Sequence, residues 1–245
     1  ELKYDFAVDL TNKQELEKVI LKVEPFSILI FLVGLAHSKG KKKDYLEFYE
    51  NNYMTLKNLL DLLENNNSIP DKILYASSIS VYGEKIDKSI YLENSSLDPK
   101  SPYAKTKLMA ENLLVNNYKH KSWILRFAPI YSEDFRLNIK RRIFFLKIPF
   151  IIAKGSYRLS LCNIKNIKDL AVGILTNKIS PNIYNISDSN SYSYLELQDV
   201  NKNPNCINIP RVLIKAVFFL GHLFKNQFFI ENSIKLVSDN IYPSN

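Results

Sequence analysis

Continuous apolar runs alternate with amphipathic stretches along the first half of the chain. Residues 27–33 are apolar throughout, and strand-length runs also cover residues 3–8, 72–77 and 122–127. A run without polar alternation is typical of a strand in a parallel sheet that is covered on both faces. The stretches between the runs have helical spacing, at residues 11–23, 44–65 and 102–118. This alternation predicts an α/β fold with a doubly wound parallel sheet.

Two of these helices have recognisable beginnings. Thr11 followed by Gln14 matches a capping box for the first helix. Ser101 followed by Pro102 matches a polar cap with proline in the first turn. We therefore expect the helix over residues 102–118 to begin sharply, at the edge of the sheet where ligands bind.

Beyond residue 129 the alternation becomes irregular. Short strands are expected near residues 158–161 and 182–186, and helices near residues 167–176 and 212–224. We place a boundary near residues 129–133 and predict two parts. Residues 1–130 form the main sheet domain, and residues 131–245 form a small α/β region.

Composition narrows the class of protein. Hydrophobic residues make up 46% of the chain, which is enough for a sizeable core. The net charge is +8, but the lysines are spread along the sequence, so we interpret them as solvated and expect no nucleic-acid partner. Cys162 and Cys206 are too few for a disulfide framework and indicate a reducing, cytoplasmic compartment. The three histidines show no metal-ligand spacing, so no metal site is expected.

The most apolar stretch, residues 212–224, is too short to span a bilayer and is interrupted by Lys215 and His222. We interpret it as a buried or interface helix. Contact of its phenylalanines with a membrane surface is the alternative.

Tyr103 and Lys107 are the first candidates for chemistry. Positions four apart lie on the same face of a helix, so the phenol and the ammonium are expected to be neighbours. Lowering a tyrosine pKa from 10 to 7 requires about 4 kcal/mol. A cation about 4–5 Å away supplies energy of that order at an effective dielectric constant near 20. Such a tyrosine can remove the proton of an alcohol during hydride transfer.

The same spacing occurs at Tyr53 and Lys57. With 15 tyrosines in the chain, chance matches to so short a pattern are expected. Tyr53 lies inside a long predicted helix, whereas Tyr103 lies at a capped helix start. We therefore interpret the Tyr53 pair as structural.

Small hydroxyl residues follow the strand over residues 72–77. Ser77, Ser78 and Ser80 lie where the carboxyl end of that strand is expected, which is where ligands bind in open α/β sheets. A serine there can hydrogen-bond the reacting hydroxyl and orient it toward the tyrosine. An ordinary strand exit with serines bonded to the backbone is the alternative.

The runs SSISVYG at 77–83 and SPYAKTKLMAE at 101–111 together resemble the NAD-dependent epimerase/dehydratase family. This family belongs to the extended short-chain dehydrogenases/reductases and is typified by UDP-glucose 4-epimerase. Tyr103 follows Ser78 by 25 residues, the family's usual separation. Further matches in order are Asp9-Leu10, residues 32–36, Asn52, residues 125–131 and residues 183–186.

The resemblance implies a Rossmann-like fold, NAD as cofactor with NADP as an alternative, and a nucleotide-sugar substrate. It implies Ser78, Tyr103 and Lys107 as catalytic residues. Substrate contacts are then expected from Ser78, Tyr103, Pro129 and Arg158, the last pairing with a phosphate; an ordinary surface cation is the alternative for Arg158. Cofactor contacts are expected from Asp9, Leu10, Leu32, Val33, Gly34, Ala36, Asn52, Ser77, Tyr103, Lys107, Phe127 and Ala128.

Several features depart from the family pattern. No glycine-rich fingerprint precedes Asp9, so we expect the first βαβ unit to be missing and the sequence to be an N-terminally truncated fragment. Pro129 stands where an asparagine is common. Ile79 and Ser80 stand where the family's dehydratases have an acid–base pair, which disfavours dehydration.

Three functions therefore stay open. A nucleotide-sugar epimerase is favoured over a keto-sugar reductase and over a non-catalytic binding protein. The family resemblance also implies a homodimer through the helices over residues 44–65 and 102–118.

Overall fold

The computed structural model describes residues 6–36, 45–83, 85, 89–145, 147–201 and 205–244. The chain forms two compact units, each built from separate segments. The first unit contains residues up to 81 with 99–125 and 181–183, and the second contains 82–98, 126–180 and the residues from 184 onward. These units are defined by packing alone, so a cofactor domain of residues 1–130 and a substrate domain of residues 131–245 stay a prediction.

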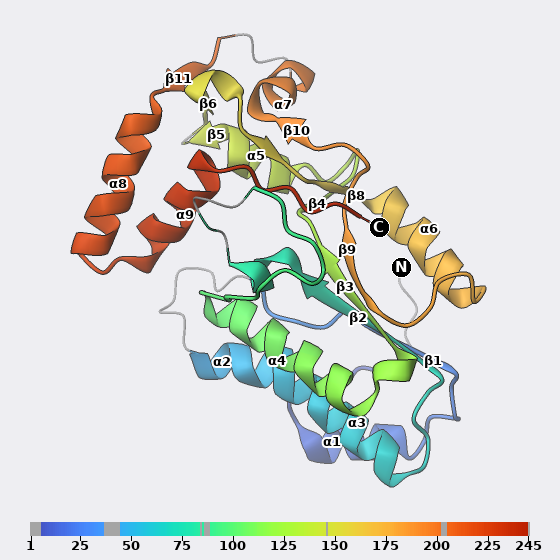
Figure 1. Ribbon diagram of the computed structural model, residues 1–245. Helices are drawn as coiled ribbons and strands as arrows, with labels where there is room; N and C mark the ends of the chain where they lie inside the picture. Colours follow the sequence, from blue (N-terminus) through green and yellow to red (C-terminus); the bar gives the residue numbers. More distant parts are fainter. Residues whose placement is uncertain are drawn as a thin grey trace. The chain divides into compact units, whose positions relative to one another are not determined.

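The central sheet has the strand order β1-β2-β3-β9 (Figure 1). Its strands are β1 (Ile28–Phe31), β2 (Lys72–Ser78), β3 (Ser122–Phe127) and β9 (Ile183–Ile186). β1 and β2 are parallel, with Phe31 opposite Tyr75. Their carboxyl ends therefore lie at one edge of the sheet, and residues 32–36 and 79–80 follow directly from that edge. This confirms the predicted α/β fold with a parallel sheet.

Leucine-rich helical faces pack on this sheet. The helical elements of the first unit are α1 (Lys13–Ile20), α2 (Tyr45–Tyr49), the π-helical turn η1 (Glu50–Met54), α3 (Thr55–Asn65) and α4 (Pro102–Asn117). The buried leucines of α3 share one core with Ile73 and Tyr75 of β2 and Leu114 of α4. α2, η1 and α3 form a continuous helical stretch that runs beside α4 (Figure 1).

The predicted beginning of α4 is confirmed. The Ser101 side chain accepts a hydrogen bond from the Ala104 N–H at 3.2 Å, and Pro102 occupies the first turn. The strand predicted over residues 122–127 coincides with β3. A serine cap and an uninterrupted apolar run are strong local signals, which is why these two boundaries follow from sequence.

The predicted capping box of Thr11 and Gln14 is wrong. Asn12 caps α1 instead, because its side chain accepts the Glu15 N–H at 3.3 Å. The Thr11 hydroxyl donates to Asp9 Oδ1 at 2.7 Å. Residues 6–8, the described part of the predicted strand over residues 3–8, are not in a strand.

Short strands and helices build the second unit. Its strands are β4 (Ile130–Tyr131), β5 (Phe144–Phe145), β6 (Ile148–Ile152), β7 (Arg158–Leu159), β8 (Cys162–Asn163), β10 (Tyr192–Ser193) and β11 (Ile207–Ile209). Its helices are α5 (Leu137–Ile143), α6 (Ile164–Leu175), α7 (Tyr194–Val200), α8 (Arg211–Leu223) and α9 (Gln227–Val237). The strands of this unit form three small sheets, with the orders β11-β6-β5, β10-β7 and β4-β8.

A buried polar network lies inside the second unit. The Arg126 guanidinium donates to the Tyr82 hydroxyl at 2.9 Å and to the Glu93 carbonyl at 3.1 Å. The Tyr82 hydroxyl in turn donates to Asn185 Oδ1 at 2.6 Å. The Tyr82 ring also lies 5.7 Å from the ring of Tyr242. These bonds satisfy a buried cation and join three separate segments of this unit.

α8 presents an apolar face that the described residues do not cover. Val212 is 74% exposed and Phe219 is 69% exposed, whereas Gly221 on the other side is buried against Ile230 of α9. This face is therefore not buried within the described residues, and the interpretation of residues 212–224 as an interface helix stays a prediction. Among the described residues, no helix has the length and hydrophobicity that crossing a membrane requires.

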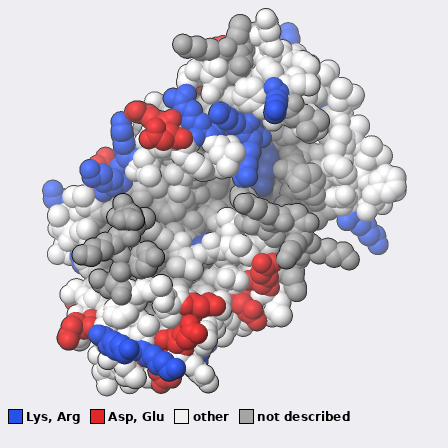
Figure 2. Space-filling model, turned by 180° about the vertical axis from the view of Figure 1, so that it is seen from behind, with Lys and Arg blue, Asp and Glu red and all other residues white. Residues whose placement is uncertain are grey.

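Charged side chains of both signs occur on the face shown in Figure 2. Within the described part of the chain, no group of three or more histidine, cysteine or acidic side chains is arranged to hold a metal ion. Cys162 is buried and Cys206 is half-buried, and both are free thiols.

Candidate active site

Ser78 is the last residue of β2, and the 3₁₀ turn η2 (Ile79–Tyr82) follows it directly. The turn folds Ser80 back onto Ser78. Both the Ser80 backbone N–H and the Ser80 hydroxyl donate to Ser78 Oγ, at 3.2 and 3.0 Å. Ser78 is half-buried at the carboxyl end of the strand, the edge at which open parallel sheets bind ligands.

Tyr103 lies in the first turn of α4 and reaches Ser78. The Ser101 cap and Pro102 determine where the helix begins, and thereby which way Tyr103 points. Ser78 lies near enough to the phenol for its hydroxyl to lower the pKa of Tyr103. Burial has the larger effect and raises that pKa above its usual value. The protein groups alone therefore do not produce the lowered tyrosine pKa that the spacing suggested, because desolvation of the phenolate outweighs them.

Lys107 lies one helical turn after Tyr103 on α4 and is only 4% exposed. Its ammonium donates to the Ala76 carbonyl of β2 at 2.7 Å. The Lys107 Nζ is 6.0 Å from the centre of the Tyr103 ring and 4.9 Å from that of Tyr75. Burial lowers the pKa of Lys107 to about 8, and the charge of Glu111 opposes this shift. The structure therefore brings together the three predicted catalytic residues, Ser78, Tyr103 and Lys107.

Glu111 is a buried carboxylate one helical turn beyond Lys107. The Ser77 hydroxyl donates to Glu111 Oε1, and both side chains lie inside the first unit. The hydroxyl of Ser77, a predicted cofactor contact, is therefore engaged with α4. Glu111 was not among the predicted site residues, although its spacing of four from Lys107 placed both on one helix face.

Asn52 links the segment that follows β1 to helix α4. It lies in the π-helical turn η1 and is fully buried. Its Oδ1 accepts the Leu35 N–H at 2.5 Å, and its Nδ2 donates to the Leu35 carbonyl at 3.1 Å. The same Nδ2 donates to Thr106 Oγ1 at 3.2 Å, next to Lys107 in the sequence. A π-turn often occurs at a functional site because it re-aims one side chain.

Gly34 lies against the side chains of Lys107 and Asn52. A β-carbon at this position would be 3.1 Å from Lys107 Nζ and 3.1 Å from Asn52 Oδ1, closer than ordinary contact. Residues 32–34 and 36 are exposed on the segment that leaves β1. The chain backbone thus passes unusually close to the buried ammonium.

These residues fit a dinucleotide cofactor. Among the described residues, the Lys107 ammonium has one hydrogen bond, to Ala76, so two of its three N–H donors face no protein acceptor. Ribose hydroxyls are acceptors of the kind that such donors bind. The missing side chain at Gly34 lets Lys107 and Asn52 lie close against the segment after β1, in which residues 32–34 and 36 are exposed to a ligand. Asp9 is exposed, with Oδ1 bonded to Thr11, and Leu10 is half-buried.

Comparison with known proteins decides the family. The model of the NAD dependent epimerase/dehydratase family matches residues 5–187. The chain belongs to this family. The recognition made from residues 77–83 and 101–111 is therefore confirmed, and so is an NAD-type cofactor as the family's requirement.

Relatives of known activity are similar over part of their length. The bifunctional protein GAL10 of Pachysolen tannophilus is 32% identical over 133 residues, which are 51% of this chain and 19% of that protein. UDP-glucose 4-epimerase 2 of Oryza sativa subsp. japonica is 32% identical over 112 residues, 46% of this chain and 26% of the relative. The matched segments thus span about a fifth to a quarter of these two relatives.

Solved structures show the same fold. UDP-glucuronic acid 4-epimerase from Bacillus cereus, solved in complex with NAD, superposes with a TM-score of 0.62 at 24% identity. The superposition covers 82% of this chain and 67% of that structure. This likeness confirms the Rossmann-like fold of the chain.

The remaining predicted contacts lie in the second unit. Phe127 is half-buried, Ala128 is buried and donates its N–H to the Ile186 carbonyl at 3.0 Å, and the Pro129 carbonyl accepts the Cys162 N–H at 3.1 Å. Ala128 and Pro129 thus hold β3 and β4 to their neighbours within this unit.

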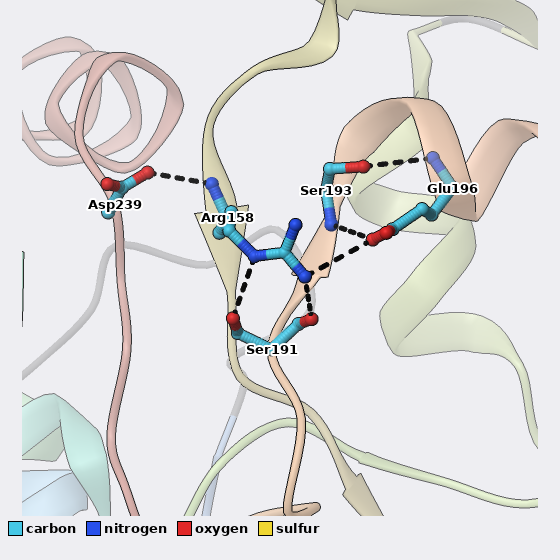
Figure 3. A network of polar contacts seen from close by, with 5 residues as sticks. All are labelled: Arg158, Ser191, Ser193, Glu196 and Asp239. Atoms are coloured by element: carbon cyan, nitrogen blue, oxygen red, sulfur yellow. Dashed lines mark hydrogen bonds and ion pairs between the residues drawn. The ribbon is translucent and has the colours of Figure 1, made fainter.

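Arg158 is held by a polar network (Figure 3). Its Nε donates to Ser191 Oγ at 2.9 Å, and its guanidinium also donates to the Ser191 carbonyl. Glu196 lies 3.5 Å from the same guanidinium and caps α7 together with Ser193. The Arg158 backbone N–H donates to Asp239 Oδ1 at 2.7 Å.

Arg158 also lines a cavity of about 560 Å³ within the second unit. The residues that line it include Ser160, Ser187, Asp188 and Asn190, together with apolar side chains such as Val200 and Ile241. Arg158 is thus a partly exposed cation of β7 on the wall of this cavity, and its role toward a phosphate stays a prediction.

Proposed function

We propose that the protein is an NAD(P)-dependent nucleotide-sugar epimerase, which oxidises a sugar hydroxyl and reduces the resulting ketone from the other face. The observation that supports this most is that Ser78, Tyr103 and Lys107 lie together: Ser78 is near enough to lower the Tyr103 pKa, and the buried Lys107 Nζ is 6.0 Å from the centre of the tyrosine ring. These three groups come from β2 and α4 and meet at the ligand-binding edge of the sheet.

Proton transfer at the sugar oxygen is the task of Tyr103. The phenolate accepts the hydroxyl proton, and the adjacent Lys107 charge stabilises that phenolate. Ser78 hydrogen-bonds the same sugar oxygen and keeps it within reach of Tyr103. Bound NAD would supply the acceptor for the hydride of the sugar carbon and, once reduced, the donor for its return. Tyr103 then gives its proton back to the alkoxide.

Lys107 would hold the cofactor with the two N–H donors that have no acceptor among the described residues. Gly34 permits close approach of the Lys107 ammonium to the segment after β1, and Asn52 holds the Leu35 backbone of that segment. The cofactor would lie along this segment. Asp9 and Leu10 would contact the adenine end. Phe127 and Ala128 would approach the nicotinamide, as the family resemblance implies.

Substrate binding would use the second unit. Arg158 suits a phosphate of the nucleotide, since a guanidinium binds phosphate oxygens through two parallel hydrogen bonds. The polar cavity that it lines supports this role. Pro129 would border the sugar without donating an amide hydrogen bond.

The same catalytic residues would serve a keto-sugar reductase, which consumes reduced cofactor. Incubation of the full-length protein with nucleotide sugars and NAD distinguishes the two. An epimerase converts a sugar labelled with deuterium at the reacting carbon into its epimer, keeps the label and consumes no added NADH. A reductase oxidises one NADH or NADPH for each product molecule. Failure of every nucleotide sugar to react with either cofactor would favour a non-catalytic binding protein.

A homodimer is part of the proposal. Tyr45 and Leu46 of α2 are exposed, and the Tyr45 ring stacks on Tyr49 at 6.2 Å. A second copy packed against α2 and α4 would form a four-helix bundle. Light scattering of the wild type and of a Leu46→Glu variant tests this, with a dimer expected for the first and a monomer for the second.

A further inference from the structure

Ser78 Oγ receives two hydrogen bonds from one residue. The Ser80 backbone N–H donates at 3.2 Å and the Ser80 hydroxyl at 3.0 Å. The 3₁₀ turn η2 makes this possible, because it begins at Ile79 and brings the residue two positions on back over the strand end. Ser80 itself is half-buried.

A serine hydroxyl has one proton to donate and two lone pairs that accept. Ser80 fills both accepting positions of Ser78 Oγ. The remaining capacity of Ser78 is therefore its own proton. Tyr103 is near enough for Ser78 to lower its pKa, which is the effect of a donor on a phenolate. With both lone pairs of Ser78 occupied, the tyrosine cannot donate to Ser78 without displacing Ser80.

We propose that Ser80 is a positioning residue that makes Ser78 a hydrogen-bond donor only, aimed at the oxygen that carries negative charge. This inference rests on the proposed function for its catalytic consequence. In the free site the oxygen is that of Tyr103. With a sugar bound, it is the sugar oxygen at which an alkoxide develops when hydride adds to the ketone.

A donor directed at a developing negative charge stabilises that charge and costs no reorganisation during the reaction. Without the Ser80 hydroxyl, one lone pair of Ser78 becomes available. The neutral Tyr103 phenol can then donate to Ser78, which favours the protonated phenol. Loss of the hydroxyl should therefore make Tyr103 a weaker acid and slow hydride return.

Other titratable groups near Tyr103 stay in place when Ser80 is changed. Among the described residues of this unit, those that face Tyr103 or its neighbours are Lys107 and Glu111 of α4 and Tyr75 of β2. None of them bonds Ser80 within the described residues. A change in Tyr103 ionisation upon substitution of Ser80 therefore reports on Ser78.

The decisive comparison uses Ser80→Ala and Ser80→Thr. Alanine keeps the backbone N–H bond and removes the hydroxyl bond, whereas threonine keeps both. Titration of Tyr103 by NMR of ¹³C-labelled tyrosine, assigned with Tyr103→Phe, needs no turnover. We expect the Tyr103 pKa to rise by about half a unit to one unit in Ser80→Ala, as for one lost hydrogen bond, and to be unchanged in Ser80→Thr.

Turnover gives the second measurement. Ser80→Ala should lower kcat by about threefold to tenfold, leave KM for the cofactor unchanged and move the acidic limb of kcat/KM to higher pH. In a Ser78→Ala background, the same substitution should have no further effect.

An unchanged Tyr103 titration in Ser80→Ala overturns the proposal, and so does an equal loss of activity with and without Ser78. Because the titration is independent of catalysis, an inactive protein would contradict the proposed function and still leave the role of Ser80 decided.

Discussion

The side chain of Asn52 pairs with both backbone groups of Leu35, as a neighbouring strand would. Its Oδ1 accepts the Leu35 N–H at 2.5 Å, and its Nδ2 donates to the Leu35 carbonyl at 3.1 Å. A side chain from a helix thereby holds the segment that leaves β1, directly beside the buried ammonium of Lys107. The third bond of the carboxamide, to Thr106, ties that segment to α4.

Replacing Asn52 with alanine should destabilise the fold. The substitution leaves two buried or half-buried backbone groups and a threonine hydroxyl without their partner, so the free energy of unfolding should fall by about 2 kcal/mol. Urea unfolding measures the loss. Asn51→Ala is the matched control, since the Asn51 side chain makes an exposed bond to the Glu47 carbonyl, and it should change stability by less than about 0.5 kcal/mol. Equal losses in both variants would argue against the bridging role.

Burial of Lys107 predicts an unusual dependence of stability on pH. Its pKa is lowered to about 8 in the folded chain from 10.5 in an unfolded one. Between these values the unfolded chain binds more protons, so this residue makes stability rise with pH from about 8 to about 10.5. Relative to Lys107→Met, the wild type should gain up to about 3 kcal/mol over that interval. Urea unfolding of both proteins at several pH values checks this, and a constant or falling difference would contradict it.

Glu111 should keep Lys107 charged. Its carboxylate raises the pKa of Lys107 against the effect of burial. In Glu111→Gln the Lys107 pKa should fall below about 8, and the alkaline limb of kcat/KM should move to lower pH with it. Ser77→Ala is the control, because it removes the hydrogen bond to Glu111 and leaves the charge. If the glutamine variant kept the wild-type alkaline limb, Glu111 would have no electrostatic role in this site.

Adding a β-carbon at Gly34 should weaken cofactor binding. The new atom would be 3.1 Å from Lys107 Nζ and from Asn52 Oδ1, so the ammonium must shift from the position in which we propose that it holds the cofactor. We expect Gly34→Ala to raise the Kd for NAD at least about tenfold, with little loss of thermal stability, since residues 33–34 are exposed. Calorimetric titration with NAD measures this, and wild-type affinity would contradict the placement of the cofactor.

Strong local signals explain the parts of the fold that sequence alone predicts. The run over residues 122–127 is apolar or buried at nearly every position, and it forms β3 with the predicted ends. Ser101 and Pro102 start α4 where expected. At the N-terminus, Thr11 and Asn12 are both good caps, and periodicity cannot choose between neighbours. The structure selects Asn12 because the Thr11 hydroxyl bonds Asp9.

The residues of the candidate site likewise fall into those that the sequence predicts and those that it does not. Ser78, Tyr103 and Lys107 follow from a spacing that the family shares, and the structure brings them together. The role of Ser80 depends on a 3₁₀ turn, and that of Asn52 on a π-turn, neither of which has a sequence period. The partners of Arg158 come from residues 191, 196 and 239, and contacts between segments so far apart in sequence cannot be read from local pattern.

The two Tyr-x-x-x-Lys pairs allow a direct test of the catalytic assignment. Lys57 Nζ is bound to Asp61 at 2.5 Å and Tyr53 packs on the Tyr49 ring at 5.3 Å, so this pair has structural partners of its own. The turnover of full-length Tyr103→Phe and Tyr53→Phe proteins should be compared on a reactive nucleotide sugar. Our account predicts a loss of at least about a hundredfold for Tyr103→Phe, with unchanged cofactor affinity, and near-wild-type turnover for Tyr53→Phe. Wild-type turnover in Tyr103→Phe would contradict it.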